Sequence, residues 1–335
     1  MVCGTRVWDL RELKDVIIPE ETERIGKYWF YRCSIASVEI PASVKYIDAY
    51  AFYECKSLKC VTFAEGSRLE RIGENCFSES KIIEISIPSN VTLIEEYAFY
   101  DCKRLKRVTF AEDSKLERIG DWCFLGSGIG EIKLPGTLKK IGDGTFCGCD
   151  NLKTVYVEDR CEISLADAGV PDSANVIPLP TPTIGGIDIQ DLRKMKNVVI
   201  PEGTEKIGNY WFWDSWMESI TVPASVREIG ADAFYRCRNL RRVTFAPRSK
   251  LKMIGVGGFR KSGIGKIVIP KNTEEILDSA FKGCGNLTEI VIERGSKLKT
   301  MHNSVFYDCY NLKNIRLPDG LEKIGIKCFN DSGLE

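Results

Sequence analysis

The sequence of 335 residues has one histidine, no net charge and no long apolar run. A single histidine leaves little scope for histidine-dependent catalysis or for a histidine-rich metal site. With 47 Lys and Arg against 47 Asp and Glu, the chain lacks the basic surplus that is typical of a general nucleic-acid binder. No apolar run approaches the roughly 18 residues of a membrane helix, and Met1 leads directly into charged sequence. No signal peptide, membrane anchor or transmembrane segment is therefore visible.

What the sequence does contain is a repeat. At 44% hydrophobic and 28% charged residues it is typical of a chain that forms a core. An Ile followed five residues later by a Phe, as in Ile25 and Phe30, recurs through the chain, and with Met301 in place of Ile once there are twelve copies. Short segments of alternating apolar and polar residues that end in Ile-Pro or Phe-Ala, such as 38–41 and 61–64, flank these copies. Such alternation predicts β-strands.

The predicted strands are evenly spaced. They end at residues 18, 40, 63, 87, 110, 134 and 157, and then at 200, 222, 245, 269, 292 and 317. Most intervals are 22 to 25 residues, which lies in the range of leucine-rich repeats. Alternate strands are 47 residues apart, because one turn of each pair is tight and the other has two extra residues.

A larger duplication divides the chain. Asp9-Leu10-Arg11 and three further motifs recur 182 residues later, the first of them at Asp191. Between the two arrays, prolines and Gly185-Gly186 indicate a linker. We predict a first array over residues 1–183, including a capping segment and linker at about 158–183, with a short helix over 161–170. The second array would cover 184–335 and end in the middle of a repeat.

The repeated positions also carry a family resemblance. The string Leu-x-x-Val-x-Ile-Pro-x-x-Val-x-x-Ile-Gly-x-x-Ala-Phe-x-x-Cys resembles the BspA-like leucine-rich repeats, over nearly the whole chain outside 158–190. The resemblance implies a β-rich α/β solenoid, a right-handed superhelix with a parallel sheet on its concave face and short helical or strand segments on the convex side. It also implies a location on a cell surface and adhesion to host or matrix proteins.

The 14 cysteines follow the repeat. Seven of them occupy one slot, three residues after the repeat Phe, and five other copies have Ser there. Exchange between Cys and Ser indicates a small side chain beneath a turn, so we favour buried free thiols over occasional disulfides, and both over a metal site. No cofactor and no metal ligand set is predicted. Free thiols fit a reducing compartment, which leaves the cytoplasm open beside the surface or secreted location.

Positions that alternate outward from the strands are the candidates for binding a partner. Over thirteen strands they hold twelve basic and six acidic residues. The candidate residues on this concave face are Lys59, Lys106, Arg107, Lys153, Tyr156, Arg241, Arg242, Lys313 and Arg316. Cross-strand charge pairing that stabilises the sheet would explain the same residues. The alternative is a basic surface suited to an acidic protein or a sulfated glycan.

Aromatic side chains form a second candidate set. Tyr or Trp follows the repeat Phe in six of twelve copies, and residues such as Tyr50, Tyr97 and Trp122 recur two positions before it. Packing at the edge of the core and anchoring of a partner are both open. Trp213 and Trp216 depart from the repeat and are the individual aromatic anchors that we would mutate first.

These features predict a binding or adhesion module that is not an enzyme and that presents a repeat-built surface to a protein or glycan partner. They predict no nucleic-acid ligand and no membrane insertion. The alternative is a structural protein whose arrays stack end to end between chains.

Overall fold

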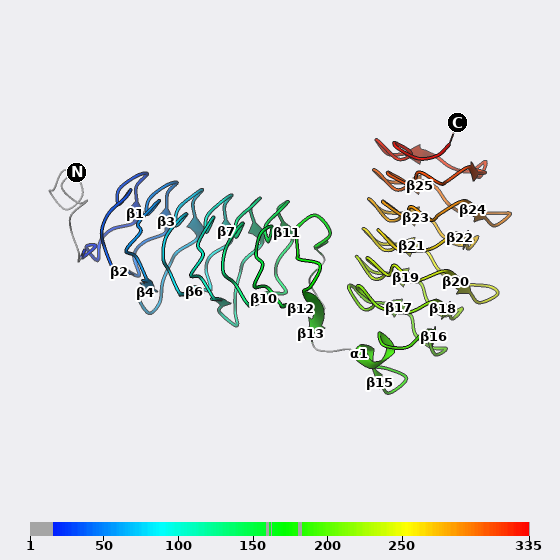
Figure 1. Cartoon of the computed structure of the whole chain (residues 1–335), viewed down its shortest axis with the longest axis horizontal. Coiled ribbons are helices and arrows are strands. Elements are labelled where there is room, and N and C mark those ends of the chain that lie inside the picture. Colours follow the sequence, from blue (N-terminus) through cyan, green and yellow to red (C-terminus); the bar gives the residue numbers. More distant parts are fainter. Residues whose placement is uncertain (1–15, 159–160, 162, 180–182, 335) are drawn as a thin grey trace. The chain divides into compact units, whose positions relative to one another are not determined.

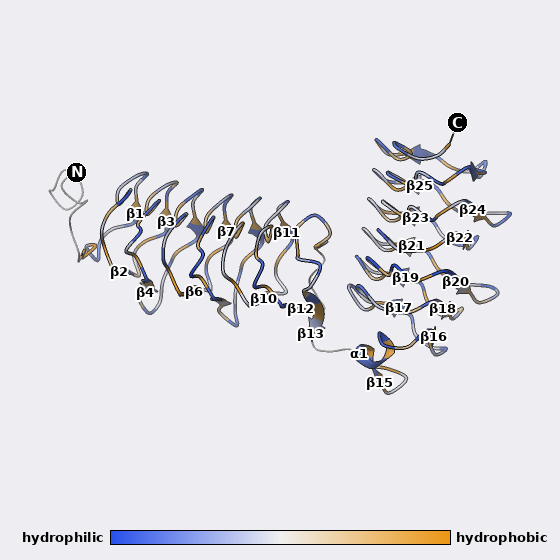
Figure 2. Ribbon diagram, viewed as in Figure 1, coloured by the Kyte–Doolittle hydropathy of each residue, from blue (hydrophilic) through white to orange (hydrophobic). Residues whose placement is uncertain are grey.

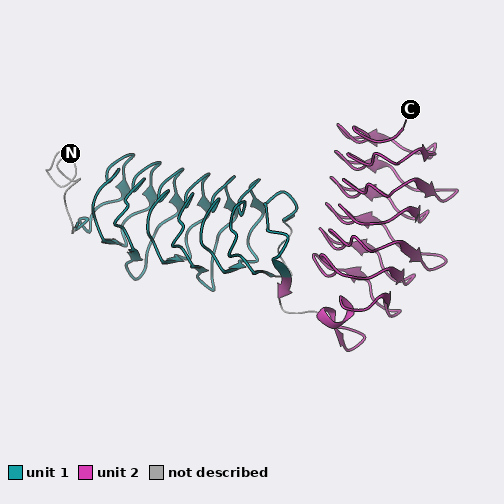
Figure 3. Cartoon of the chain, viewed as in Figure 1, with its two compact units in different colours: residues 1–176 teal, residues 177–335 magenta. Residues whose placement is uncertain are grey.

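The fold is a coil of short parallel strands. The computed structural model describes residues 16–158, 161, 163–179 and 183–334 (Figure 1). Twelve of the thirteen predicted strands are present, whereas residues 16–18, where the first was predicted to end, are not in a strand. The described residues form two compact units, 1–176 and 177–335, which we describe separately (Figure 3). Lys14 and Asp15, which are among the twelve basic and six acidic residues counted at outward strand positions, lie outside the described residues.

Each unit has two parallel sheets that run along its coil. In unit 1 the long-strand sheet contains β2 (Ser37–Ile40), β4 (Cys60–Phe63), β6 (Glu84–Ile87), β8 (Arg107–Phe110), β10 (Glu131–Leu134) and β12 (Thr154–Glu158). Its last member is β13 (Asn175–Leu179), which begins in unit 1 and crosses the boundary after residue 176. The short-strand sheet contains β1 (Arg24–Ile25), β3 (Tyr46–Ile47), β5 (Arg71–Ile72), β7 (Leu93–Ile94), β9 (Arg118–Ile119) and β11 (Lys140–Ile141).

Unit 2 repeats this plan after a small cap. The cap consists of β14 (Thr183–Ile184), β15 (Ile187–Asp188) and the single turn of helix α1 (Ile189–Leu192), which Asp188 caps at its N-terminus. The long-strand sheet contains β16 (Asn197–Val199), β18 (Ser219–Val222), β20 (Arg242–Phe245), β22 (Lys266–Ile269), β24 (Glu289–Ile292) and β26 (Asn314–Ile315). The short-strand sheet contains β17 (Lys206–Ile207), β19 (Glu228–Ile229), β21 (Met253–Ile254), β23 (Glu275–Ile276), β25 (Thr300–Met301) and β27 (Lys323–Ile324).

The core consists of columns of identical slots. Apolar residues recur at the same places in successive coils (Figure 2). In unit 1 the rings of Phe30, Phe52, Phe77, Phe99, Phe124 and Phe146 stack one on the next, with centroids 4.9 to 5.9 Å apart. A second column runs from Phe212 to Phe329 in unit 2. Each repeat therefore buries its apolar face against its neighbours, as the repeat pattern requires.

The predicted helix over 161–170 is wrong. Among the described residues of this segment, 166–169 form a turn, and the backbone N–H of Phe146 donates to the carbonyl of Ala168. In the other turns this acceptor is the residue directly before the repeat Phe, such as Ala51 before Phe52, so Ala168 takes that place and Gly169 follows where the Phe would stand. The segment is a shortened repeat that leads into β13. Its Ala and Asp residues obscure that pattern because the bulky Phe is missing.

Candidate functional site

Three lysines lie in one line across the long-strand sheet of unit 1. Lys59, Lys106 and Lys153 each precede a strand (β4, β8 and β12), and each is exposed. Backbone hydrogen bonds connect the line: Lys59 accepts from Ile83, Ile83 from Lys106, Lys106 from Gly130, and Gly130 from Lys153. Two strand spacings of about 4.8 Å separate successive lysines, so this lysine row repeats at roughly 10 Å.

The lysine row differs from the other cations of the same sheet. Arg107 pairs with Glu84 at 3.2 Å and Lys133 with Glu158 at 3.5 Å. No described residue forms an ion pair with Lys59, Lys106 or Lys153. Cross-strand pairing thus explains Arg107, whereas the lysine row has charge available to a partner. Glu39 and Glu131 lie on the same sheet and keep this face from being uniformly basic.

Hydroxyl groups continue the surface beyond the lysine row. Thr62, Ser86 and Thr109 are exposed in the third positions of β4, β6 and β8, and Ser86 and Thr109 are direct register partners. Thr62 and Ser86 also line a hollow of about 440 Å³, together with Ser67, Ser89 and Asn90. The hollow lies where the long turn after β4 and the tight turn after β6 meet. It was not predicted, although the alternation of long and tight turns is visible in the sequence.

The corresponding sheet of unit 2 has fewer open cations. Lys196 pairs with Glu218 at 3.0 Å and Lys266 with Glu289 at 2.7 Å. The Arg241 guanidinium donates to the carbonyl of Gly263 at 3.1 Å. The remaining predicted residues, Arg242, Lys313 and Arg316, are exposed, and Arg316 lines a separate hollow of about 620 Å³ at 289–296 and 314–320.

The repeat family follows from the sequence. The family described as the BspA type leucine-rich repeat region matches residues 8–82, 70–165, 176–288 and 246–335. The chain belongs to the BspA-type leucine-rich repeat family. No curated protein matches it.

Solved structures of similar chains are distant. A leucine-rich repeat protein from Bacteroides ovatus is 24% identical with a TM-score of 0.45, and the alignment covers 92% of this chain and 68% of that one. A leucine-rich cell surface protein from Faecalibacterium prausnitzii is 24% identical, with a TM-score of 0.41 and coverage of 91% and 83%. The pneumococcal vaccine antigen PcpA is 21% identical, with a TM-score of 0.38 and coverage of 90% and 79%.

The prediction that Trp213 of this BspA-type chain is an aromatic anchor for a partner is wrong. Trp213 is 1% exposed, and its ring lies 4.2 Å from that of Tyr235, so it belongs to the core of unit 2 and presents no surface to a partner. Trp216, three residues later, is 76% exposed and remains a candidate. Tyr156 is half-buried beside Lys133, its register partner. Sequence spacing could not separate the two tryptophans because both fall in one irregular turn.

The thiols of the BspA-type repeat serve the fold. Cys55, Cys102, Cys149, Cys237 and Cys284 are buried, and each donates to the carbonyl of the Phe in the preceding turn at 2.8 to 3.1 Å. Burial raises the pKa of Cys102 to about 12 and those of Cys237 and Cys284 to about 11. The described residues include no group of three or more His, Cys, Asp or Glu that could hold a metal ion. In the described part of the chain no helix is both long and apolar enough to span a bilayer.

Proposed function

We propose that this protein is a non-enzymatic binding module, and that the lysine row of unit 1 holds an acidic ligand. The observation that carries the proposal is the contrast within one sheet. Lys59, Lys106 and Lys153 are exposed and no described residue forms an ion pair with them, while Arg107 and Lys133 are matched by acids.

The rigidity of the fold supports this role. The three lysines are fixed by the same backbone ladder, so a repeating acidic ligand meets cations at a regular spacing without reordering the backbone. The hydroxyl groups of Thr62, Ser86 and Thr109 add hydrogen-bonding groups on the same face. A sulfated glycan and an acidic protein segment both supply such anions.

The test compares two sets of variants of the full chain. K59Q/K106Q/K153Q removes the lysine row. K206Q/K252Q/K299Q removes the same charge from three lysines of unit 2 that lie in or directly before β17, β21 and β25, where each lysine is ion-paired. Binding of a heparin hexasaccharide and of a polyglutamate peptide is measured by calorimetry at two salt concentrations.

We expect the first set to weaken binding of at least one probe by about tenfold and the second set to change it little. Higher salt should weaken the wild-type interaction because exposed charges are screened. Equal losses in both sets would show a general charge effect and would refute the assignment to the lysine row.

A further inference from the structure

The turn before each repeat Phe begins with a residue in the left-handed region. In unit 1 this turn slot is filled in order by Tyr28, Tyr50, Asn75, Tyr97, Trp122 and Gly144, with φ between 51° and 62°. Asn and Gly are the residues expected there, whereas a bulky aromatic residue at positive φ is an outlier. The same turn forms with Asn75 and Gly144, so the fold does not require aromatic rings in this slot.

In unit 1 the aromatic residues of this slot are also incompletely buried, whereas Tyr210 in the same slot of unit 2 is buried. Trp122 is 37% exposed and Tyr97 is half-buried. The two rings stack with centroids 5.3 Å apart, and Tyr100 meets Tyr97 edge to face at 5.8 Å. The three rings thus form a small platform on the surface. Stacking offsets part of the backbone strain, but it does not explain why strained positions hold rings that remain in contact with solvent.

The aromatic residues in the earlier turns of unit 1 show which chemical groups such rings attract. The Lys27 ammonium lies 5.0 Å from the centroid of the Tyr28 ring and 5.7 Å from that of Tyr50. The Arg32 guanidinium lies 5.0 Å from the Tyr31 ring and donates to Glu54 at 2.8 Å. Here the protein covers its own aromatic rings with cations, and the carboxylate of Glu54 helps to hold one of them, Arg32.

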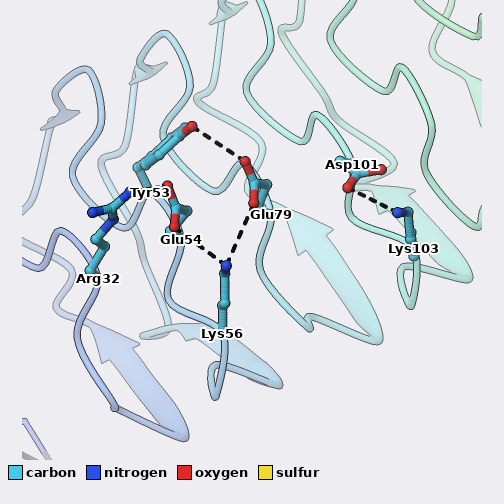
Figure 4. Close-up of polar contacts among 7 residues, drawn as sticks. All are labelled: Arg32, Tyr53, Glu54, Lys56, Glu79, Asp101 and Lys103. Carbon is cyan, nitrogen blue, oxygen red and sulfur yellow. Dashed lines mark hydrogen bonds and ion pairs between the residues drawn. The ribbon is translucent and has the colours of Figure 1, made fainter.

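Figure 4 shows the carboxylates that follow along this edge. Lys56 lies between Glu54 and Glu79, at 3.4 and 4.0 Å, and Lys103 pairs with Asp101 at 3.2 Å (Figure 4). These lysines are therefore engaged with carboxylates. Among the described residues no cation lies over Tyr97, Tyr100 or Trp122.

Acidic residues accompany the uncovered platform. Glu74, Glu96, Asp121 and Asp143 hold the position before the turn slot in four successive turns. Backbone hydrogen bonds place Asp121 beside Tyr97 and Asp143 beside Trp122, because the N–H of each aromatic residue donates to the carbonyl of the acid in the next turn, at 3.1 and 2.9 Å. Of the four, Glu96 has Arg118 within 3.9 Å, Glu74 accepts from the Tyr50 hydroxyl at 3.1 Å, and Asp121 accepts from the backbone N–H of Asp143 at 3.1 Å. Among these acids only Glu96 is paired with a cation of the described residues. Rings and carboxylates of this arrangement fit a guanidinium or an ammonium group.

We propose that this acid–aromatic edge, formed by Tyr97, Tyr100 and Trp122 with Glu74, Glu96, Asp121 and Asp143, binds an Arg- or Lys-rich peptide segment of a partner. Cations of the partner would lie above the rings of Tyr97 and Trp122, as Lys27 and Arg32 of this chain lie above the rings of the preceding turns. This surface is separate from the lysine row and has the opposite charge preference, so the two proposals stand or fall independently.

The test uses a labelled nona-arginine peptide and the full chain, with binding followed by fluorescence anisotropy at fixed ionic strength. W122N and Y97N place at each position the residue that the native turn already has as Asn75. We expect each to weaken binding about tenfold without lowering the thermal midpoint. D121N/D143N keeps the rings and should weaken binding similarly, and K59Q/K106Q/K153Q should not weaken it.

Several results would overturn the proposal. One is absence of peptide binding by the wild type, and another is unchanged binding in both W122N and D121N/D143N. If W122N and W122G both lower the thermal midpoint while peptide binding per folded molecule is unchanged, the rings serve the fold alone. If binding of neutral oligosaccharides on a glycan array depends on Trp122 and nona-arginine does not compete, the edge recognises sugars instead.

Discussion

The thiol of Cys102 donates a hydrogen bond to the carbonyl oxygen of Phe77, one turn earlier, at 3.1 Å. The hydroxyl of Ser80 lies 3.4 Å from the same sulfur. Both Cys and Ser occur in this slot because both are small and both can hydrogen-bond beneath the turn. The thiol in this slot therefore ties the turn to the one before it at Cys55, Cys102, Cys149, Cys237 and Cys284.

Cys102→Ser should change stability little, because a hydroxyl can donate to the same carbonyl and Ser80 already occupies the equivalent place. Cys102→Val should lower the free energy of unfolding by about 1 kcal/mol, since it removes the thiol donor to the Phe77 carbonyl, which keeps only the backbone N–H of Ser80 at 3.2 Å. Chemical denaturation of the two variants measures the difference. A Ser variant that is less stable than the Val variant would contradict the role that we give to the hydrogen bond.

Stability should fall in alkaline solution. Burial raises the pKa of Cys102 to about 12 and of Cys237 and Cys284 to about 11, from an ordinary value near 9. Above pH 9 the unfolded chain loses thiol protons that the folded chain retains, so the unfolded state binds fewer protons and stability decreases as pH rises toward 11 to 12. The slope of unfolding free energy between pH 8.5 and 10.5 tests this. The triple Cys→Ser variant at these positions should have a shallower slope, and an equal slope would show that other groups cause the loss.

Phe99→Ala should be among the most destabilising single changes in unit 1. The Phe99 ring is fully buried and lies between Phe77 and Phe124, at 5.5 and 5.4 Å. Removing it leaves a cavity that the parallel ladders hold open, at a cost of about 3–5 kcal/mol. Phe99→Leu, which fills more of that volume, is the matched control and should lose less. Equal losses would indicate that the column depends on ring stacking rather than on volume.

Gly144→Ala should destabilise the turn before Phe146, against which the ring of Trp122 packs. Gly144 has φ 61°, and a Cβ added there would lie 2.5 Å from atoms of the Trp122 indole. The substitution combines left-handed strain with displacement of the ring, and we expect a loss of about 1–3 kcal/mol. In the W122N background only the strain remains, so the loss should be smaller. A double-mutant cycle with no coupling would contradict the contact.

The repeat slots show how far the sequence leads. Ile25 and Phe30 and their copies, spaced as the coil requires, identify the strands and the columns, because a solenoid uses each slot for one purpose. The shortened repeat at 166–169 was interpreted as a helix because it lacks the Phe that marks each of the other turns, and Gly169 stands after Ala168 in its place.

Surface properties were harder to predict than the core. That Arg107 is paired and Lys106 is not depends on where Glu84 lies across the sheet, which sequence spacing does not give. Likewise the left-handed conformation of Trp122 is not visible in its own copy, although Gly144 and Asn75 at the same slot are a signal for it. Burial of Trp213 depends on packing against Tyr235 in the next turn.

The most direct test of the binding proposal compares two adjacent cations. Lys106 and Arg107 are neighbours, both are exposed, and only Arg107 has an acidic partner. Affinities of K106Q and R107Q for whichever acidic probe binds the wild type should be measured side by side at low salt. Our proposal predicts that K106Q weakens binding clearly more than R107Q, because the charge of Arg107 is already matched by Glu84. An equal or larger loss in R107Q would contradict it.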